Sequence, residues 1–276
     1  MRNKNDPQPG VITPGGSKPG LEFLARHNGW LAGVSLVAVL GAWALIIDWG
    51  QPPTFLLPPQ RAVWTKFLQV AGDGTLLFHT WTTLSEVLLG LLIGSVVAMG
   101  LGYALAKSRL LEKVLSPYLV ASQAIPTVAI APLLIIWFGQ GISSKVLICA
   151  LTMFFPVLVN TIIGFRAVSA NLYDLMRSMR ATRRQTLRYL ELPAALPVLL
   201  GGLRIGAALS VIGAVVGEFV GSDRGLGFLI NVGRGQFDTA LVFVSLFTLI
   251  LMAMSLYGLA MLAEKRATRW QAADRG

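Results

Sequence analysis

Six long apolar segments, separated by short polar ones, set the pattern of this chain. They run over residues 30–47, 84–106, 114–138, 146–165, 195–217 and 240–263. About 20 apolar residues cross the hydrocarbon core of a bilayer, and a backbone in lipid must satisfy its own hydrogen bonds, which favours helices. The pattern therefore predicts an all-α integral membrane protein, with six transmembrane helices inside a membrane domain of residues 29–265.

The two ends of the chain lack this apolar pattern. Four prolines and four glycines fall within residues 1–20, so we expect residues 1–28 to form a disordered tail. Residues 266–276 are polar and predict a second, shorter tail. A cleaved secretory signal is the alternative for the first apolar segment. No A-x-A cleavage site follows that segment, which favours an uncleaved span.

The overall composition agrees with a membrane protein. Hydrophobic residues make up 54% of the 276 residues and charged residues 13%, against about 25% charged in soluble domains, and the mean hydropathy is +0.66. A soluble protein of this size has too little interior for so much apolar surface, which argues against a soluble enzyme. The single cysteine, Cys149, excludes an internal disulfide.

The net charge of +10 is distributed unevenly between the polar segments. Seventeen of the 23 lysines and arginines lie in the two tails and in the loops after the second and fourth spans, whereas five lie in the other loops. Positive residues accumulate on the cytoplasmic side of a membrane. The pattern therefore predicts cytoplasmic termini, and the charge needs no nucleic-acid partner.

Small residues and prolines indicate how the spans pack. Glycines or alanines recur every fourth residue from Gly90 to Ala106 and again from Gly213 to Gly221, a spacing that lets two helices approach closely. Pro126 and Pro156 fall inside the third and fourth spans. Each could simply bend its helix, or could mark non-helical backbone that lines a cavity.

No residue pattern predicts catalysis. The chain lacks the G-x-x-x-x-G-K-[ST] sequence that cradles nucleotide phosphates, and its two histidines have no metal-ligand partner nearby in the sequence. We therefore expect no catalytic residue, no metal and no cofactor on this chain.

The loop between the fourth and fifth spans, residues 166–191, is unusually long and basic. Asn171 could cap a short helix, and Asp174 would favour the positive end of that helix. The arginines that follow, at 180, 183, 184 and 188, could lie on anionic lipid or could bind a partner protein. The residue pattern by itself leaves both interpretations open.

This loop resembles the EAA loop in permease subunits of bacterial ABC importers. The EAA pattern is E-A-A, three residues, Gly, nine residues, Ile, one residue and Leu-Pro. Leu192-Pro193 fits its end, Leu190 replaces the Ile, Asp174-Leu175-Met176 takes the place of E-A-A, and Arg180 replaces the Gly. In that family the loop is a helical coupling element that docks on a separate ATPase subunit, and the Gly permits a tight turn.

The resemblance extends over residues 75–262. Ser122–Pro126, Trp137–Gly139, Phe154–Pro156, Val216–Phe219 and Gly225–Gly227 are similar to segments of the nitrate, sulfonate and taurine permeases. That subgroup implies a type I importer fold in the bacterial inner membrane. It also implies a small solute, with an organic anion such as a sulfonate as the first expectation.

The family implies several partners. Two cytoplasmic ATPase subunits would carry ATP and Mg, a second permease subunit would complete a homodimer, and an external solute-binding protein would deliver the solute. The expected ATPase-coupling residues are Tyr173, Asp174, Leu175, Met176, Arg180, Ala181, Thr182, Arg183, Arg184, Leu190 and Pro193.

Four residues are candidates for the translocation pathway: Arg204, Glu218, Pro126 and Pro156. Arg204 could instead snorkel to lipid head groups or form a structural ion pair. Glu218 and Glu86 lie near span ends and could cap or pair structurally. Two other classes stay open beside the importer: an ion-coupled secondary transporter, and a membrane scaffold without transport.

Overall fold

The computed structural model describes residues 28–268, and within that range the regular structure is entirely helical. The all-α prediction is therefore confirmed. The predicted disordered tail, apart from Asn28, and most of the second tail lie outside the described residues. The chain divides into two compact units, residues 1–53 and 54–276.

The first unit contains one described helix, α2 (Asn28–Gly50). It includes the first predicted span, and its last 18 residues are apolar enough to cross a membrane.

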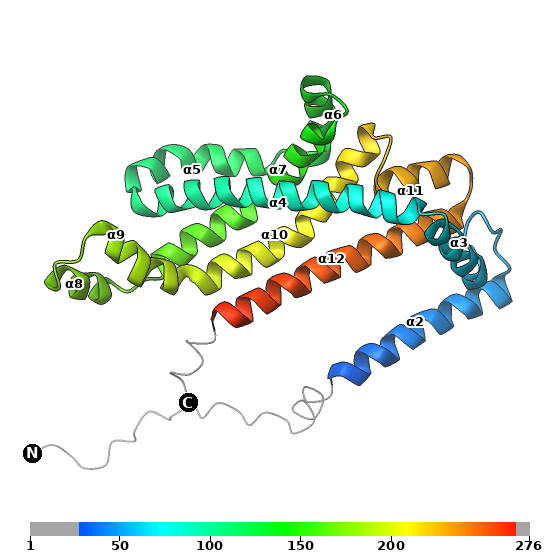
Figure 1. Cartoon of the computed structure of the whole chain (residues 1–276), viewed down its shortest axis with the longest axis horizontal. Helices are drawn as coiled ribbons and strands as arrows, with labels where there is room; N and C mark the ends of the chain where they lie inside the picture. The colour runs from blue at the N-terminus through cyan, green and yellow to red at the C-terminus, as the bar shows by residue number, and fades with distance from the viewer. Residues whose placement is uncertain (1–27, 269–276) are drawn as a thin grey trace, which may run out of the picture. The chain divides into compact units, whose positions relative to one another are not determined.

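The second unit contains all the other helices (Figure 1). Its long helices are α4 (Thr75–Lys107), α7 (Ile142–Arg166), α10 (Leu192–Gly221) and α12 (Thr239–Ala267), and its shorter ones are α3 (Gln60–Gly72), α5 (Arg109–Gln123), α6 (Thr127–Phe138), α8 (Ala170–Ser178), α9 (Arg183–Thr186), the π-helical turn η1 (Leu187–Glu191) and α11 (Leu226–Gly235). α3 and α11 lie near one end of α4, and α8 and α9 lie near the other.

The third predicted span, residues 114–138, is two helices and not one. α5 and α6 meet at a bend of 95°, and Pro126 precedes the first residue of α6. Proline cannot donate the backbone hydrogen bond that would continue a helix, and it disfavours helical backbone at the residue before it. Among residues 28–268 the chain thus has five helices that could cross a membrane, or six if this bent pair counts as one span.

α7 packs between α4 and α10, and the two glycine stripes explain how. A β-carbon added at Gly90 of α4 would collide with the Cys149 side chain of α7. A β-carbon added at Gly213 of α10 would lie 2.8 Å from the Cys149 Cα. Backbones can approach this closely only where side chains are minimal. The close packing predicted from the glycine spacing is therefore confirmed, and α7 is the shared partner of both stripes.

Two short helices, α3 and α11, have no counterpart among the predicted spans. α3 is held to the start of α12 by an ion pair in which Lys66 Nζ lies 2.8 Å from Asp238 Oδ2. α11 follows Gly225, whose φ of 105° is a conformation that favours glycine. Neither helix is long enough to span a bilayer, so neither forms an apolar run that predicts a span.

Candidate functional site

The segment between α7 and α10 forms a helical hairpin at one end of the second unit (Figure 1). Its first helix, α8, has no buried residue. Leu172 and Leu175 expose 42% and 54% of their surface on it, and Met179, directly after its last residue, exposes 69%. α8 begins after Ser169, so Asn171 is a helix residue, and the expectation that Asn171 caps the helix was wrong.

Asp174 lies on the exposed surface of α8. Its Oδ1 is 3.4 Å from Nη1 of Arg177, and both side chains are more than two-thirds exposed. An exposed ion pair of this kind contributes at most about 1 kcal/mol. The carboxylate is therefore available to a partner at little cost to the fold.

The turn after α8 keeps its tight geometry although Arg180 replaces the glycine of the EAA pattern. Arg180 has a φ of 54°, in the left-handed region. Its N–H donates to the Arg177 carbonyl, and the Ala181 N–H donates to the Met176 carbonyl, each at 2.9 Å. These bonds satisfy carbonyls at the end of α8, as glycine-terminated helices commonly do. The turn survives the substitution, and Arg180 bears the strain.

α9 begins with a reciprocal cap. The Thr182 N–H donates to Gln185 Oε1 at 2.8 Å, and Thr182 Oγ1 accepts from the Gln185 N–H at 3.3 Å. This capping box satisfies backbone donors that the first turn would otherwise leave unpaired. Thr182, which the resemblance placed in the coupling loop, therefore fixes where the second helix starts.

The chain runs from α9 through η1 into α10 without a break. Leu192-Pro193 does not end this helical stretch, because Pro193 lies in the first turn of α10. Proline is tolerated in the first turn of a helix, although it has no N–H to donate to the preceding turn. The π-helical turn η1 lies just before it. The second helix of the hairpin is thus continuous with the long helix α10.

Three side chains join the hairpin to α4. Lys107 Nζ donates to Glu191 Oε1 at 2.7 Å and to the Tyr173 hydroxyl at 3.0 Å. The same ammonium group lies 4.9 Å from the centre of the Tyr173 ring. A cavity of about 560 Å³ opens beside this junction, lined by Tyr103, Lys107, Tyr173, Arg177, Ala181, Arg183, Thr186 and Glu191.

A buried polar network occupies the opposite end of α4. Thr83 Oγ1 donates to Glu218 Oε1 at 2.6 Å and accepts from the Leu226 N–H at 2.8 Å. Glu218 Oε2 accepts from the Gly227 N–H at 2.5 Å. The Gly225 N–H donates to His79 Nδ1 at 2.9 Å. The network therefore ties the loop between α10 and α11 to α4.

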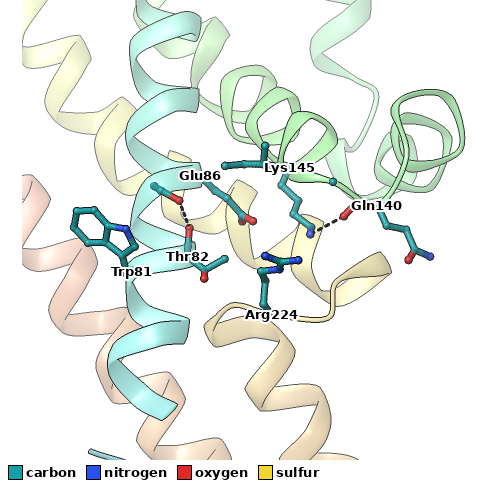
Figure 2. Close-up of a pocket in the computed structure, with 9 residues that line it drawn as sticks. Trp81, Thr82, Glu86, Gln140, Lys145 and Arg224 are labelled. Atoms are coloured by element: carbon teal, nitrogen blue, oxygen red, sulfur yellow. Dashed lines mark hydrogen bonds between the residues drawn. The ribbon is translucent and has the colours of Figure 1, made fainter. Parts of the chain in front are cut away.

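A second cavity, of about 360 Å³, lies beside this network (Figure 2). Glu86 of α4 and Lys145 of α7 both point into it, and each is at least 98% buried. Arg224 approaches from the loop after α10 and binds Asp223 through Nε and Nη2. The Arg224 guanidinium lowers the pKa of Asp223 below its ordinary value.

The four residues proposed for the pathway lie in separate places. Pro126 is at the bend between α5 and α6, and Pro156 is inside α7, where its carbonyl accepts from the Asn160 side chain. Arg204 Nη1 lies 3.2 Å from Oε2 of Glu264 on α12, and the Arg204 guanidinium lies over the Tyr257 ring. Arg204 and Glu218 are separated by 14 residues of one helix, or about 21 Å. Their assignment to a pathway stays a prediction.

Several functional candidates were not recognised in the sequence: Tyr103, Lys107, Lys145 and Glu191. Lys145 falls just before the fourth predicted span, residues 146–165, but it lies within α7 and is 2% exposed. An ionisable residue inside a membrane helix is itself a signal of function. Once the start of α7 is placed at Ile142, Lys145 meets that criterion.

Comparison with known proteins agrees with this architecture. Residues 86–269 match the family described as "Binding-protein-dependent transport system inner membrane component". The riboflavin transport system permease protein RibX of Chloroflexus aurantiacus is 48% identical over 87% of this chain and 89% of its own length. A permease of the MetNI methionine ABC transporter superposes with a TM-score of 0.63 at 19% identity, covering 72% of this chain and 98% of that one.

Two further relatives differ in the solute that their names print. The formylaminopyrimidine transport permease protein ThiX of Halalkalibacterium halodurans is 37% identical over 74% of this chain and 81% of its own length. A putative aliphatic sulfonates permease, SsuC of Bacillus subtilis, is 31% identical over 92% of this chain and 91% of its own length.

The helical bundle and the family match define an ABC importer permease of the type I fold, in the inner membrane. The chain belongs to the binding-protein-dependent transport system inner membrane component family, in the group that includes sulfonate and taurine permeases. This membership sets aside the secondary transporter and the scaffold as alternative classes.

Proposed function

We propose that this chain is one of two permease subunits of an importer that moves a small heterocyclic solute inward. Two ATPase subunits dock on the hairpins of residues 166–191, one on each permease subunit. An external solute-binding protein delivers the solute at the opposite end of the permease. Both termini lie in the cytoplasm in this arrangement, as the distribution of positive charge favours.

The exposed face of α8 is the observation that carries the docking proposal. Apolar Leu172 and Leu175 lie with the charged Asp174 on a helix that buries none of its own residues, and the exposed Met179 follows directly after that helix. A soluble partner with a complementary groove would cover these apolar groups. The hairpin continues directly into α10, so movement of the partner would reach the membrane-spanning helices.

Co-purification of an ATP-hydrolysing subunit tests this docking. The tagged chain is isolated gently from its native membrane as wild type and as Asp174→Lys. We expect the ATPase to accompany the wild type and to be lost, wholly or largely, with Asp174→Lys. Asp223→Lys is the matched control, because Asp223 is also exposed and also paired with a neighbouring arginine. An ATPase retained equally by both variants would contradict the role of Asp174.

The solute class rests on the pattern of similarity. Two relatives named for riboflavin and formylaminopyrimidine are 48% and 37% identical to this chain, and both names denote nitrogen heterocycles. An organic sulfonate is the second candidate, because the sulfonate relative aligns over 92% of the chain at 31% identity. Uptake of labelled riboflavin and labelled taurine by cells with and without this chain distinguishes the two.

A further inference from the structure

The cavity at the end of α4 remote from the coupling hairpin has the size of a small-molecule site. Its volume of about 360 Å³ falls in the lower part of the ~300–1,000 Å³ that ligand pockets usually occupy. Its walls come from α4, α7, the turn before α7 and the loop after α10. The cavity is therefore built from segments that the fold holds together, and not from one mobile loop.

Glu86 supplies this cavity with an unused hydrogen-bond acceptor. The residue is 1% exposed, and its Oε2 has no hydrogen-bond partner among the described residues. Figure 2 shows its carboxyl group directed toward Lys145 and Arg224. A buried polar atom without a partner costs about 1–3 kcal/mol, so such an atom in a cavity indicates a donor that arrives with a ligand.

Lys145 and Arg224 supply donors to the same space. Lys145 Nζ donates to the Gln140 carbonyl at 2.9 Å, which leaves further N–H groups on an ammonium that carries three. Arg224 uses Nε and Nη2 for Asp223, which leaves part of its five-donor guanidinium. Both side chains interact electrostatically with Glu86, whose carboxyl group also forms a side-chain hydrogen bond with Glu218.

The charges around the cavity do not favour a simple anion. Two cations, Lys145 and Arg224, face the carboxyl groups of Glu86, Glu218 and Asp223. Glu218 already accepts from Thr83 and Gly227. The cavity thus has no excess of positive charge, but it offers an acceptor next to donors. A neutral group that carries a donor next to an acceptor is complementary to this arrangement.

We propose that this cavity binds the polar edge of a cyclic amide or imide in the transported solute. The ring N–H donates to Glu86 Oε2, and the adjacent carbonyl oxygen accepts from Lys145 and Arg224. The proposal rests on the proposed function, since it deepens the assignment of a heterocyclic solute to a specific site on this chain.

A comparison of two solutes tests the hydrogen bond from the ring N–H. The importer is reconstituted in vesicles from this permease, its ATPase and its binding protein, and uptake of riboflavin is compared with that of N3-methylriboflavin. Methylation removes the ring N–H. Because the binding protein is the same in every sample, its own preference cancels when permease variants are compared.

The variants Glu86→Gln and Glu86→Leu weaken and then remove the hydrogen-bond acceptor at position 86. Gln keeps the shape and a weaker, neutral acceptor, whereas Leu removes the acceptor entirely. We expect preference for riboflavin over its methyl analogue to fall in the order wild type, Glu86→Gln, Glu86→Leu, by about tenfold in all. Asp73→Asn is the control, since Asp73 is an exposed carboxylate before α4 and Asn keeps the oxygen that accepts from the Thr75 N–H.

Three results would overturn the proposal. Unchanged preference with normal riboflavin uptake removes Glu86 from solute recognition. Equal loss of both solutes, with the preference unchanged, assigns Glu86 a structural role. Weaker affinity for the binding protein with unchanged preference shows that the cavity receives a protein side chain. If the wild type imports taurine and not riboflavin, the proposed solute class itself fails, a result that no variant is needed to detect.

Discussion

Lys107 Nζ lies 2.7 Å from Glu191 Oε1, so an ion pair joins the last residue of α4 to the residue immediately before α10. The Glu191 side chain is 5% exposed, whereas that of Lys107 is 35% exposed. The carboxylate therefore depends on the ammonium group much more than the ammonium depends on it. The pair joins the base of the hairpin of residues 166–191 to the membrane-spanning helix α4.

Removal of the lysine is expected to loosen this base. Lys107→Ala would leave Glu191 buried without its cation and should lower the free energy of unfolding by about 1–3 kcal/mol. It should also reduce uptake more than ATP hydrolysis, because the hairpin could then move without α4. Thermal unfolding and the ratio of solute imported to ATP hydrolysed measure the two effects.

A double-mutant cycle separates this ion pair from other effects of the lysine. Glu191→Gln combined with Lys107→Ala should cost less than the sum of the single changes. Lys113→Ala, at an exposed lysine nearby, is the control and should behave as the wild type. Strict additivity of the two changes would show that the pair contributes nothing.

The left-handed backbone at Arg180 predicts an unusual order of stability among variants at this position. Arg180→Gly should stabilise the hairpin by up to about 1 kcal/mol, because glycine adopts a φ of 54° without a steric penalty. Arg180→Val should destabilise it, since β-branched residues are least tolerant of positive φ. Melting temperatures of the purified variants give the order.

Arg184→Gly is the control for that series. Arg184 lies within α9, where glycine costs helix propensity, so this change should destabilise the protein. If Arg180→Gly and Arg184→Gly lower the melting temperature equally, the positive φ at position 180 has no energetic consequence.

The contact of Gly90 with Cys149 predicts a severe effect of one methyl group. In Gly90→Ala the new carbon would overlap the Cys149 side chain and lie 3.0 Å from the Val146 carbonyl oxygen. Overpacking of this kind costs about 1–3 kcal/mol. Gly100→Ala in the same helix meets nothing within 4 Å and should be neutral or slightly stabilising. Yield and melting temperature in detergent compare the two, and equal behaviour would contradict the close approach of α4 and α7.

Adjacent threonines on α4 test the buried network. Thr83→Val removes a hydroxyl that donates to Glu218 and accepts from Leu226, and should cost about 1–3 kcal/mol. Thr82→Val removes a hydroxyl that donates to the Phe78 carbonyl of its own helix, and should lower the free energy of unfolding much less. Hydrogen exchange of the amides of residues 225–227 should rise in Thr83→Val only. Unchanged protection there would show that the loop does not depend on Thr83.

The apolar runs specified most of the membrane architecture because burial in lipid is a local requirement. Each segment of about 20 apolar residues had to become a helix, wherever its neighbours lay. The exception was residues 114–138, where Pro126 divides the run into two helices at 95°. The sequence contained that proline, but the choice between a bend and a break depends on packing, which composition does not specify.

The all-helical membrane fold and the glycine stripes could be predicted from the sequence alone, because each follows from residues close together in the chain. The helix that those stripes face, the contact of Lys107 with Glu191, and the cavity lined by Glu86, Lys145 and Arg224 required the three-dimensional structure. Gly90 and Cys149 are 59 positions apart in the sequence, and Glu86 and Arg224 are 138 positions apart. Their chemistry depends on distance in space, and a linear pattern does not specify that distance.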